Sequence, residues 1–327
     1  MSRPGIVVLW ALVALMALWL AFHLRAIGGA FVQMGDFLQY KFIQRALVVG
    51  VLVALCAALL GVSLVLKHYS MIGDGLSHVG FGALTAALAL GYVTADTLPT
   101  WLPAGLRGGL AGLCGAIAAQ PLPFTLAVVV LCAFLLLRLS GGRRMRGDSA
   151  IALISTSALA LGVIVTSTTS GMNVDVYNYM FGSILAMSEA DVALSVALSV
   201  VVLALFFLFY PRIFAITFDE PFARATGMRA GLCNMLIASL TAVTVVVGMR
   251  IMGTLLISSL IIFPALTAMR VFSRFRPVVI CAAAVSVGCF LLGMMLSCVY
   301  SIPTGAGIVG VNLVVFLLFS AVGALRS

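Results

Sequence analysis

The sequence predicts an all-α protein that crosses a membrane many times. Hydrophobic residues make up 64% of its 327 positions, charged residues make up 8%, and the mean hydropathy is +1.27. Apolar runs close to the roughly 20 residues that a helix needs to cross a bilayer recur along the chain. A membrane barrel would instead alternate apolar and polar residues, and no such alternation is sustained. We therefore expect residues 1–327 to form a single transmembrane domain.

Each apolar run is a candidate span, because backbone polar groups in lipid must be satisfied within a helix. We expect about nine to ten transmembrane helices by this criterion. In chain order the runs are 5–24, 46–66, 74–93, 122–140, 149–167, 189–210, 230–249, 251–270, 277–298 and 304–324.

The first run would form an additional N-terminal helix within residues 1–35. Its apolar stretch, 6–22, is long for the apolar region of a signal peptide. No clear small-residue cleavage site follows it. We therefore expect this helix to anchor the chain in the bilayer.

Residues 94–121 form a glycine-rich insertion between two of the runs. The segment contains Gly105, Gly108, Gly109, Gly112 and Gly115. Because it is short and flanked by prolines, we expect an extracytoplasmic surface helix or re-entrant segment. If it spanned the membrane instead, the orientation of everything before it would be reversed.

Basic residues orient the spans, because lysine and arginine concentrate in cytoplasmic loops. The densest cluster is Arg138, Arg143, Arg144 and Arg146. That loop is therefore expected in the cytoplasm, and counting forward places the 211–229 loop there too. The first half agrees less well, because an extracytoplasmic 94–121 segment leaves Lys41 and Arg45 outside.

The remaining composition excludes several function classes. A net charge of +9 fits basic cytoplasmic loops in a lipid bilayer and not a nucleic-acid partner. The seven cysteines form no CxxC pair and are interpreted as small buried hydrophobic residues. No nucleotide-binding G-x-x-x-x-G-K-[ST] motif occurs, so any ATP hydrolysis would come from a separate chain.

Asp74 and His78 are the most informative pair in the sequence. They stand four residues apart, so they would share one face of a helix. Ionisable groups are scarce in this chain, and a central Asp costs roughly 2.5–3.5 kcal/mol to insert into a membrane. A carboxylate oxygen beside an imidazole nitrogen suits zinc, manganese or iron(II). The pair predicts a path for a divalent cation; the alternative is that Asp74 caps the helix and His78 hydrogen-bonds within the bundle.

Asp175 is a third candidate for contact with a cation. It lies in a polar, aromatic-rich segment between two runs. An incoming cation could meet it there, although an outer-loop carboxylate is more often only solvated, and aromatic residues at this edge are typical of the interfacial belt.

The 211–229 loop contains the pattern of a short capped helix. Asp219 would be its N-cap, Pro221 would suit its first turn and Gly227 would end it. Both a plain surface helix and a docking helix for a cytoplasmic partner fit this pattern. The docking candidates are Asp219, Glu220, Pro221, Phe222, Ala223, Arg224 and Gly227.

Several segments in the same order resemble the permease subunits of the zinc, manganese and iron ABC importers, from about Gln39 to the C-terminus. The segment 71–78 is similar to the family's GDALSH-type signature, with Gly75 in place of the usual Ala. The 218–227 segment is similar to the loop that docks on the ATPase. The other matching segments are 39–47, 181–186 and 262–268.

The resemblance implies a permease bundle that imports a divalent transition metal and is not itself an enzyme. The metal would be cargo, with no permanently bound cofactor. The implied partners are a cytoplasmic ATP-binding subunit, an extracytoplasmic metal-binding protein and a second permease copy or paralogue, in a bacterial cytoplasmic (inner) membrane. Asp74 and His78 would line the cation path, the 219–227 helix would transmit ATP-driven motion, and 94–121 would lie outside. The helix within 1–35 and the 94–121 insertion depart from the family pattern.

Two other functions fit the same residues. An ABC permease for a bulky metal chelate, such as a siderophore or cobalamin, would have a similar architecture but would not need a paired Asp74 and His78. An ion-coupled secondary metal transporter could use the pair as a proton relay without any ATPase. The capped 219–227 segment argues against the second alternative. Zinc, manganese and iron(II) share these donor atoms, so the residues do not choose among the metals.

Overall fold

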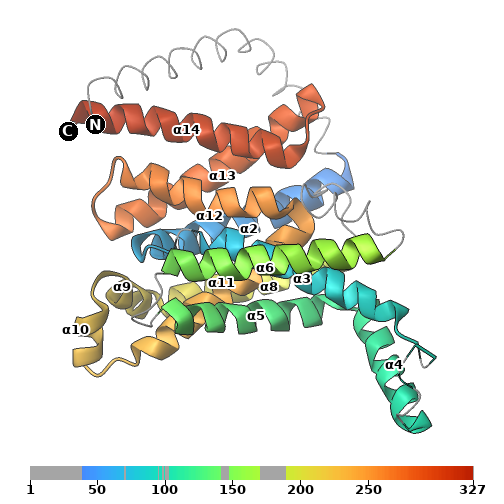
Figure 1. The fold of residues 1–327 in the computed structure, drawn as a ribbon. Helices are drawn as coiled ribbons and strands as arrows, with labels where there is room; N and C mark the ends of the chain where they lie inside the picture. Colours follow the sequence, from blue (N-terminus) through green and yellow to red (C-terminus); the bar gives the residue numbers. More distant parts are fainter. Residues whose placement is uncertain are drawn as a thin grey trace.

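The protein is a bundle of long α-helices with two short helices, α9 and α10, at one end (Figure 1). The computed structural model describes residues 39–69, 71–94, 96–97, 99, 103–140, 147–169 and 189–326. These residues contain helices and no strand, which confirms the all-α prediction. The expected N-terminal helix at 5–24, Asp175 and the 181–186 segment lie outside the described residues.

Twelve α-helices are described, and a 3₁₀ turn, Leu90–Tyr92, extends the second of them. Among the described residues, eight helices are long and apolar enough to cross a membrane, while α4 and α12 are apolar but shorter. The helices are α2 Lys41–Leu66, α3 Ile72–Ala89, α4 Ala104–Ala119, α5 Pro121–Ser140, α6 Gly147–Thr168, α8 Glu189–Leu208, α9 Tyr210–Phe218, α10 Glu220–Ala225, α11 Ala230–Met252, α12 Thr254–Met269, α13 Phe275–Tyr300 and α14 Thr304–Arg326.

The polytopic prediction is confirmed, and the helices follow the apolar runs closely. The run at 251–270 becomes α12, which begins only after a break at Gly253. Gly253 has a φ of +84°, a left-handed conformation that glycine adopts without a side-chain clash. This break lets the chain turn directly from α11 into α12 with a single residue between them.

The core of the bundle forms around α2, which packs against α8, α11, α12 and α13. At Gly61 the backbones of α2 and α12 come very close, since a Cβ atom there would lie 2.1 Å from the carbonyl oxygen of Ile261. Small residues permit such contacts between membrane helices, where packing replaces the hydrophobic effect as the driving force.

Two ion pairs hold the start of α8 at the end of the bundle opposite α10. Glu189 pairs with Arg45 of α2, and Asp191 Oδ1 lies 2.9 Å from Arg250 Nη2 near the end of α11. The first of these pairs joins residues 144 positions apart. Arg250 therefore joins the end of α11 to the start of α8.

The glycine-rich insertion forms α4, which projects from the bundle at the end opposite α9 and α10 (Figure 1). No residue of α4 is buried. A Cβ atom added at Gly105, Gly108, Gly109 or Gly112 would meet nothing within 4 Å. The insertion is therefore helical, and it contributes little to the packed core.

Candidate functional site

Asp74 and His78 lie side by side in the first turns of α3. His78 Nε2 is 3.6 Å from Asp74 Oδ2, and the side chains are 22% and 46% exposed respectively. Because metal bonds to nitrogen and oxygen are roughly 2.0–2.2 Å long, one cation can bridge two donors at this separation with an open angle. The spacing of four residues therefore produces the shared face that the sequence predicts.

The helix-cap alternative for Asp74 does not hold. The helix begins at Ile72, its N-cap residue is Met71, and no side chain makes a capping hydrogen bond. Asp74 instead points toward α12, where Ser258 Oγ lies 3.4 Å from Asp74 Oδ1. The carboxylate thus has one oxygen beside His78 and the other beside α12.

Two glycines allow α3 to bring Asp74 this close to its neighbours. A Cβ atom at Gly73 would lie 2.7 Å from Cδ1 of Ile261 in α12, and one at Gly75 would lie 2.7 Å from Cγ2 of Ile151 in α6. Gly75, which stands where the resembling family usually has Ala, therefore fits a tight contact between α3 and α6.

Ser258 carries no signal of a site in the sequence. It lies in an apolar helix, and its hydroxyl also donates to the carbonyl oxygen of Thr254 at 2.9 Å. Thr254 and Ser258 are also four residues apart. They therefore share one face of α12, as Asp74 and His78 share one face of α3, but they are uncharged. Only the fold shows that this stripe of α12 faces α3.

The pair brings together one carboxylate and one imidazole, side-chain types that ligate divalent metals in proteins. Within the described ranges, no group of three or more His, Cys, Asp or Glu side chains is placed to hold a metal. Asp175 lies outside those ranges. An incomplete set of ligands suits an ion that must be released as well as bound, since a transport path needs binding that is not too strong.

The 219–227 segment forms the capped helix α10. Asp219 Oδ1 accepts a 2.9 Å hydrogen bond from the Phe222 backbone N–H, and Pro221 stands in the first turn. Gly227 ends the segment with a φ of +84°. Phe222 is 64% exposed, whereas Ala223 is buried. The helix therefore presents an exposed aromatic side chain at this end of the bundle.

An aromatic cluster adjoins α10. The rings of Phe214 and Phe218 in α9 lie 5.2 and 5.7 Å from the ring of Phe275 at the start of α13. Both α9 phenylalanines are also partly exposed. The cluster packs α9 against the start of α13, and its two exposed rings lie on the helix that directly precedes α10.

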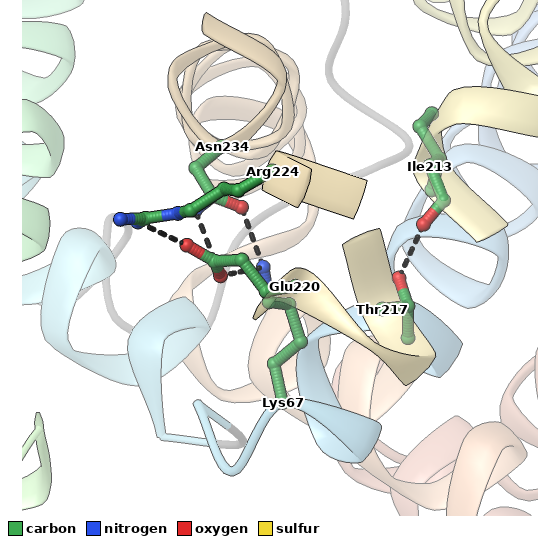
Figure 2. Close-up of polar contacts among 6 residues, drawn as sticks. All are labelled: Lys67, Ile213, Thr217, Glu220, Arg224 and Asn234. Carbon is green, nitrogen blue, oxygen red and sulfur yellow. Dashed lines mark hydrogen bonds and ion pairs between the residues drawn. The ribbon is translucent and has the colours of Figure 1, made fainter. Parts of the chain in front are cut away.

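Glu220 points inward, as Figure 2 shows, toward Lys67 at the end of α2 and Asn234 in α11. Arg224 contacts the other carboxylate oxygen at 2.6 Å. Burial alone would raise the pKa of Glu220, but hydrogen bonds from Asn234 and Arg224 and the charge of Lys67 outweigh it and hold that pKa below its usual value. Glu220 is therefore ionised at neutral pH, and its carboxylate is already bound by side chains of the same protein.

Comparisons with known proteins agree with this architecture. The model of the ABC 3 transport family matches residues 39–323. The manganese transport system membrane protein MntC of Halalkalibacterium halodurans is 28% identical over 282 residues, which cover 86% of this chain and 87% of that protein. The manganese import system permease protein ScaB of Streptococcus gordonii is 26% identical over 280 residues, which cover 86% of this chain and 91% of that protein.

A solved structure has the same fold. PsaBC from Streptococcus pneumoniae, in complex with Fab, matches with a TM-score of 0.70 at 22% identity, covering 92% of this chain and 100% of that one. The family match spans most of the sequence, and eight described helices are suited to crossing a membrane. The chain is therefore a multi-pass membrane permease, a transport component and not an enzyme, and it belongs to the ABC 3 transport family.

Proposed function

We propose that this chain is the membrane-spanning subunit of an ATP-driven importer for a divalent transition metal. The observation that carries the proposal is the Asp74–His78 pair, whose oxygen and nitrogen donors lie 3.6 Å apart at the start of α3. Manganese is the first candidate cargo, because relatives over most of the chain are named as manganese transport proteins. Zinc and iron(II) bind the same donor atoms, so the uptake of both is also measured.

The energy would come from a separate ATP-binding subunit docked on α10. The chain has no nucleotide-binding P-loop of its own. Exposed Phe222 and the aromatic cluster of α9 offer that subunit an apolar surface, beside which exposed Arg224 is paired with Glu220. A second permease copy or a paralogue would complete the membrane part of the transporter.

The opposite end of the bundle would face an extracytoplasmic metal-binding protein. Since α4 projects at the end away from α10, docking of the ATPase on α10 puts the 94–121 insertion outside the cytoplasm. A bacterial cytoplasmic membrane is the setting that fits this arrangement of partners.

The experiment is metal uptake by proteoliposomes that contain this chain, its ATPase and its metal-binding protein. We expect ATP-dependent uptake of manganese that is lost in Asp74→Ala and in His78→Ala. Ser77→Ala is the matched control, because Ser77 lies between the pair but donates its hydroxyl to the Gly73 carbonyl at 2.7 Å within α3. This control should transport like the wild type.

Two outcomes would contradict the proposal. Uptake of a metal chelate that survives both pair variants would favour a permease for siderophores or cobalamin. Uptake that proceeds without ATP would favour an ion-coupled secondary transporter, with Asp74 and His78 as a proton relay. Parallel uptake assays with zinc and iron(II) identify the cargo.

A further inference from the structure

Three polar side chains form a closed triangle: one from α10, one from α11 and one from the residue that caps α2. Lys67 Nζ donates to Glu220 Oε2 at 3.2 Å, and Asn234 Nδ2 donates to the same oxygen at 3.2 Å. Lys67 Nζ also donates to Asn234 Oδ1 at 2.5 Å. Figure 2 shows the carboxylate of Glu220 among the side chains of Lys67, Asn234 and Arg224. We call these three residues the clasp.

The clasp is shielded from solvent. The side chain of Lys67 is 11% exposed and that of Glu220 is 26% exposed. Separating the pair is costly for Lys67, because its poorly hydrated ammonium would be left beside the neutral amide of Asn234. The clasp therefore resists separation of α2 from α10 more strongly than an ion pair on an open surface would.

Lys67 is tied directly to the helix that carries Asp74 and His78. It caps α2, and the chain then turns through His68, whose φ is +61°. The Tyr69 N–H donates to the Leu64 carbonyl at 2.9 Å, and the His68 N–H donates to the Val65 carbonyl at 3.1 Å. These two bonds form the Schellman pattern that closes a helix end.

The turn continues directly into α3. The Ile72 N–H donates to the Tyr69 carbonyl at 3.1 Å, and Ile72 is the first residue of α3. The hydrogen bonds at Tyr69 thus connect the end of α2 with the first turn of α3, so a displacement of Lys67 would move that turn. The first turns of α3 hold Asp74 and His78.

We propose that the clasp is the link through which movement of α10 reaches the Asp74–His78 pair. Within this proposal, which rests on the proposed function, the docking segment has two kinds of residue. Exposed Phe222 meets the ATPase, whereas Glu220 contacts Lys67 and transmits the movement. Lys67 is a positioning residue that acts on the cation pair through the backbone of the turn, and Asn234 in α11 holds Lys67 and Glu220 together.

The test is the coupling ratio, the number of metal ions taken up per ATP hydrolysed, in proteoliposomes of the complete transporter. We expect Lys67→Met and Glu220→Gln each to lower this ratio by about tenfold or more. Because both variants break the same contact, the double variant should lose no more than the worse of the two single variants. Lys41→Met is the matched control, since Lys41 is exposed at the other end of α2, and it should keep the wild-type ratio.

The coupling ratio separates transmission from a general loss of structure. A merely unstable transporter loses ATPase activity and uptake together, so its ratio stays near that of the wild type. Asn234→Ala provides a second variant that retains both charges, and we expect an intermediate ratio. The proposed role of the clasp would be overturned if Lys67→Met and Asn234→Ala kept the wild-type coupling ratio. It would also be overturned if the losses of the two single variants multiplied in the double variant.

These results are distinguishable from failure of the proposed function. If the wild type shows no ATP-dependent metal uptake, the proposed function itself is wrong. If the wild type transports metal and His78→Ala does not, but Lys67→Met keeps the wild-type coupling ratio, only the proposed role of the clasp is wrong.

Discussion

The hydroxyl of Ser258 in α12 lies 3.4 Å from Oδ1 of Asp74 in α3, although 184 positions separate the two residues. The same hydroxyl lies 2.9 Å from the Thr254 carbonyl, so its single proton is shared between two acceptors. Oδ2 of Asp74 is meanwhile 3.6 Å from His78 Nε2. Asp74 is thus oriented by one contact within its own helix and one from α12.

Replacing Ser258 by alanine should weaken cation binding without stopping transport. The contact with Asp74 is long and shared, so its loss should raise the KM for metal uptake by roughly two- to tenfold, the range expected for one modest hydrogen bond. Ser239→Ala is the control, because that hydroxyl donates to the Met235 carbonyl in its own helix. An unchanged KM in Ser258→Ala would show that the serine does not orient Asp74.

Gly61→Ala should destabilise the bundle. A Cβ atom at Gly61 would meet the Ile261 carbonyl oxygen at 2.1 Å, so α2 and α12 must move apart, at a cost of about 1–3 kcal/mol. Thermal unfolding of the purified chain measures this effect. Gly288→Ala, at a helical position with open space, should be neutral or slightly stabilising, because alanine favours a helix more than glycine does. Equal melting temperatures for the two variants would contradict the close contact.

The stability that Glu220 contributes should depend on pH with a definite sign. Its pKa in the folded protein lies below the ordinary 4.5. A carboxyl whose folded pKa is depressed stabilises the fold fully above the ordinary pKa and loses this effect as the pH falls through the depressed value. The excess stability of wild type over Glu220→Gln should therefore be constant near neutral pH and shrink only below 4.5. Melting curves that converge at a higher pH would contradict this assignment.

Cysteine labelling should place α4 and α10 on opposite sides of the membrane. In a chain with its native cysteines replaced, Gly112→Cys in α4 should react with a membrane-impermeant maleimide in intact cells. Ala225→Cys, which lies exposed at the end of α10, should react only after the cells are opened. The converse labelling would reverse the orientation and move the 94–121 insertion into the cytoplasm.

Hydropathy and spacing were sufficient to predict much of this molecule. Hydropathy located the spanning helices, because a membrane helix must be apolar over its length. The spacing of Asp74 and His78 predicted their shared face, and the Asp219, Pro221 and Gly227 pattern predicted α10 with its cap. These features depend on neighbours in sequence, which a pattern records.

Other features depend on which helices meet, and the sequence does not record that. Ser258 and Lys67 belong to apolar helices whose neighbours are set by packing over the whole bundle. Glu220 illustrates the difference, since its position in the capped helix was predicted but its inward direction depends on Lys67 and Asn234. The need for a glycine at position 61 likewise comes from the backbone of α12, which the sequence of α2 does not show.

Among the described residues, Asp74 and His78 offer a cation only two donor side chains, which has a consequence for its hydration. An ion such as manganese(II) has about six coordination positions that oxygen and nitrogen donors share with water. A cation that meets one carboxylate and one imidazole therefore retains water in most of those positions. Dehydration at the pair would then be partial, and two protein ligands would hold the ion less tightly than a full set of donors. A path built in this way would release its ion readily instead of retaining it.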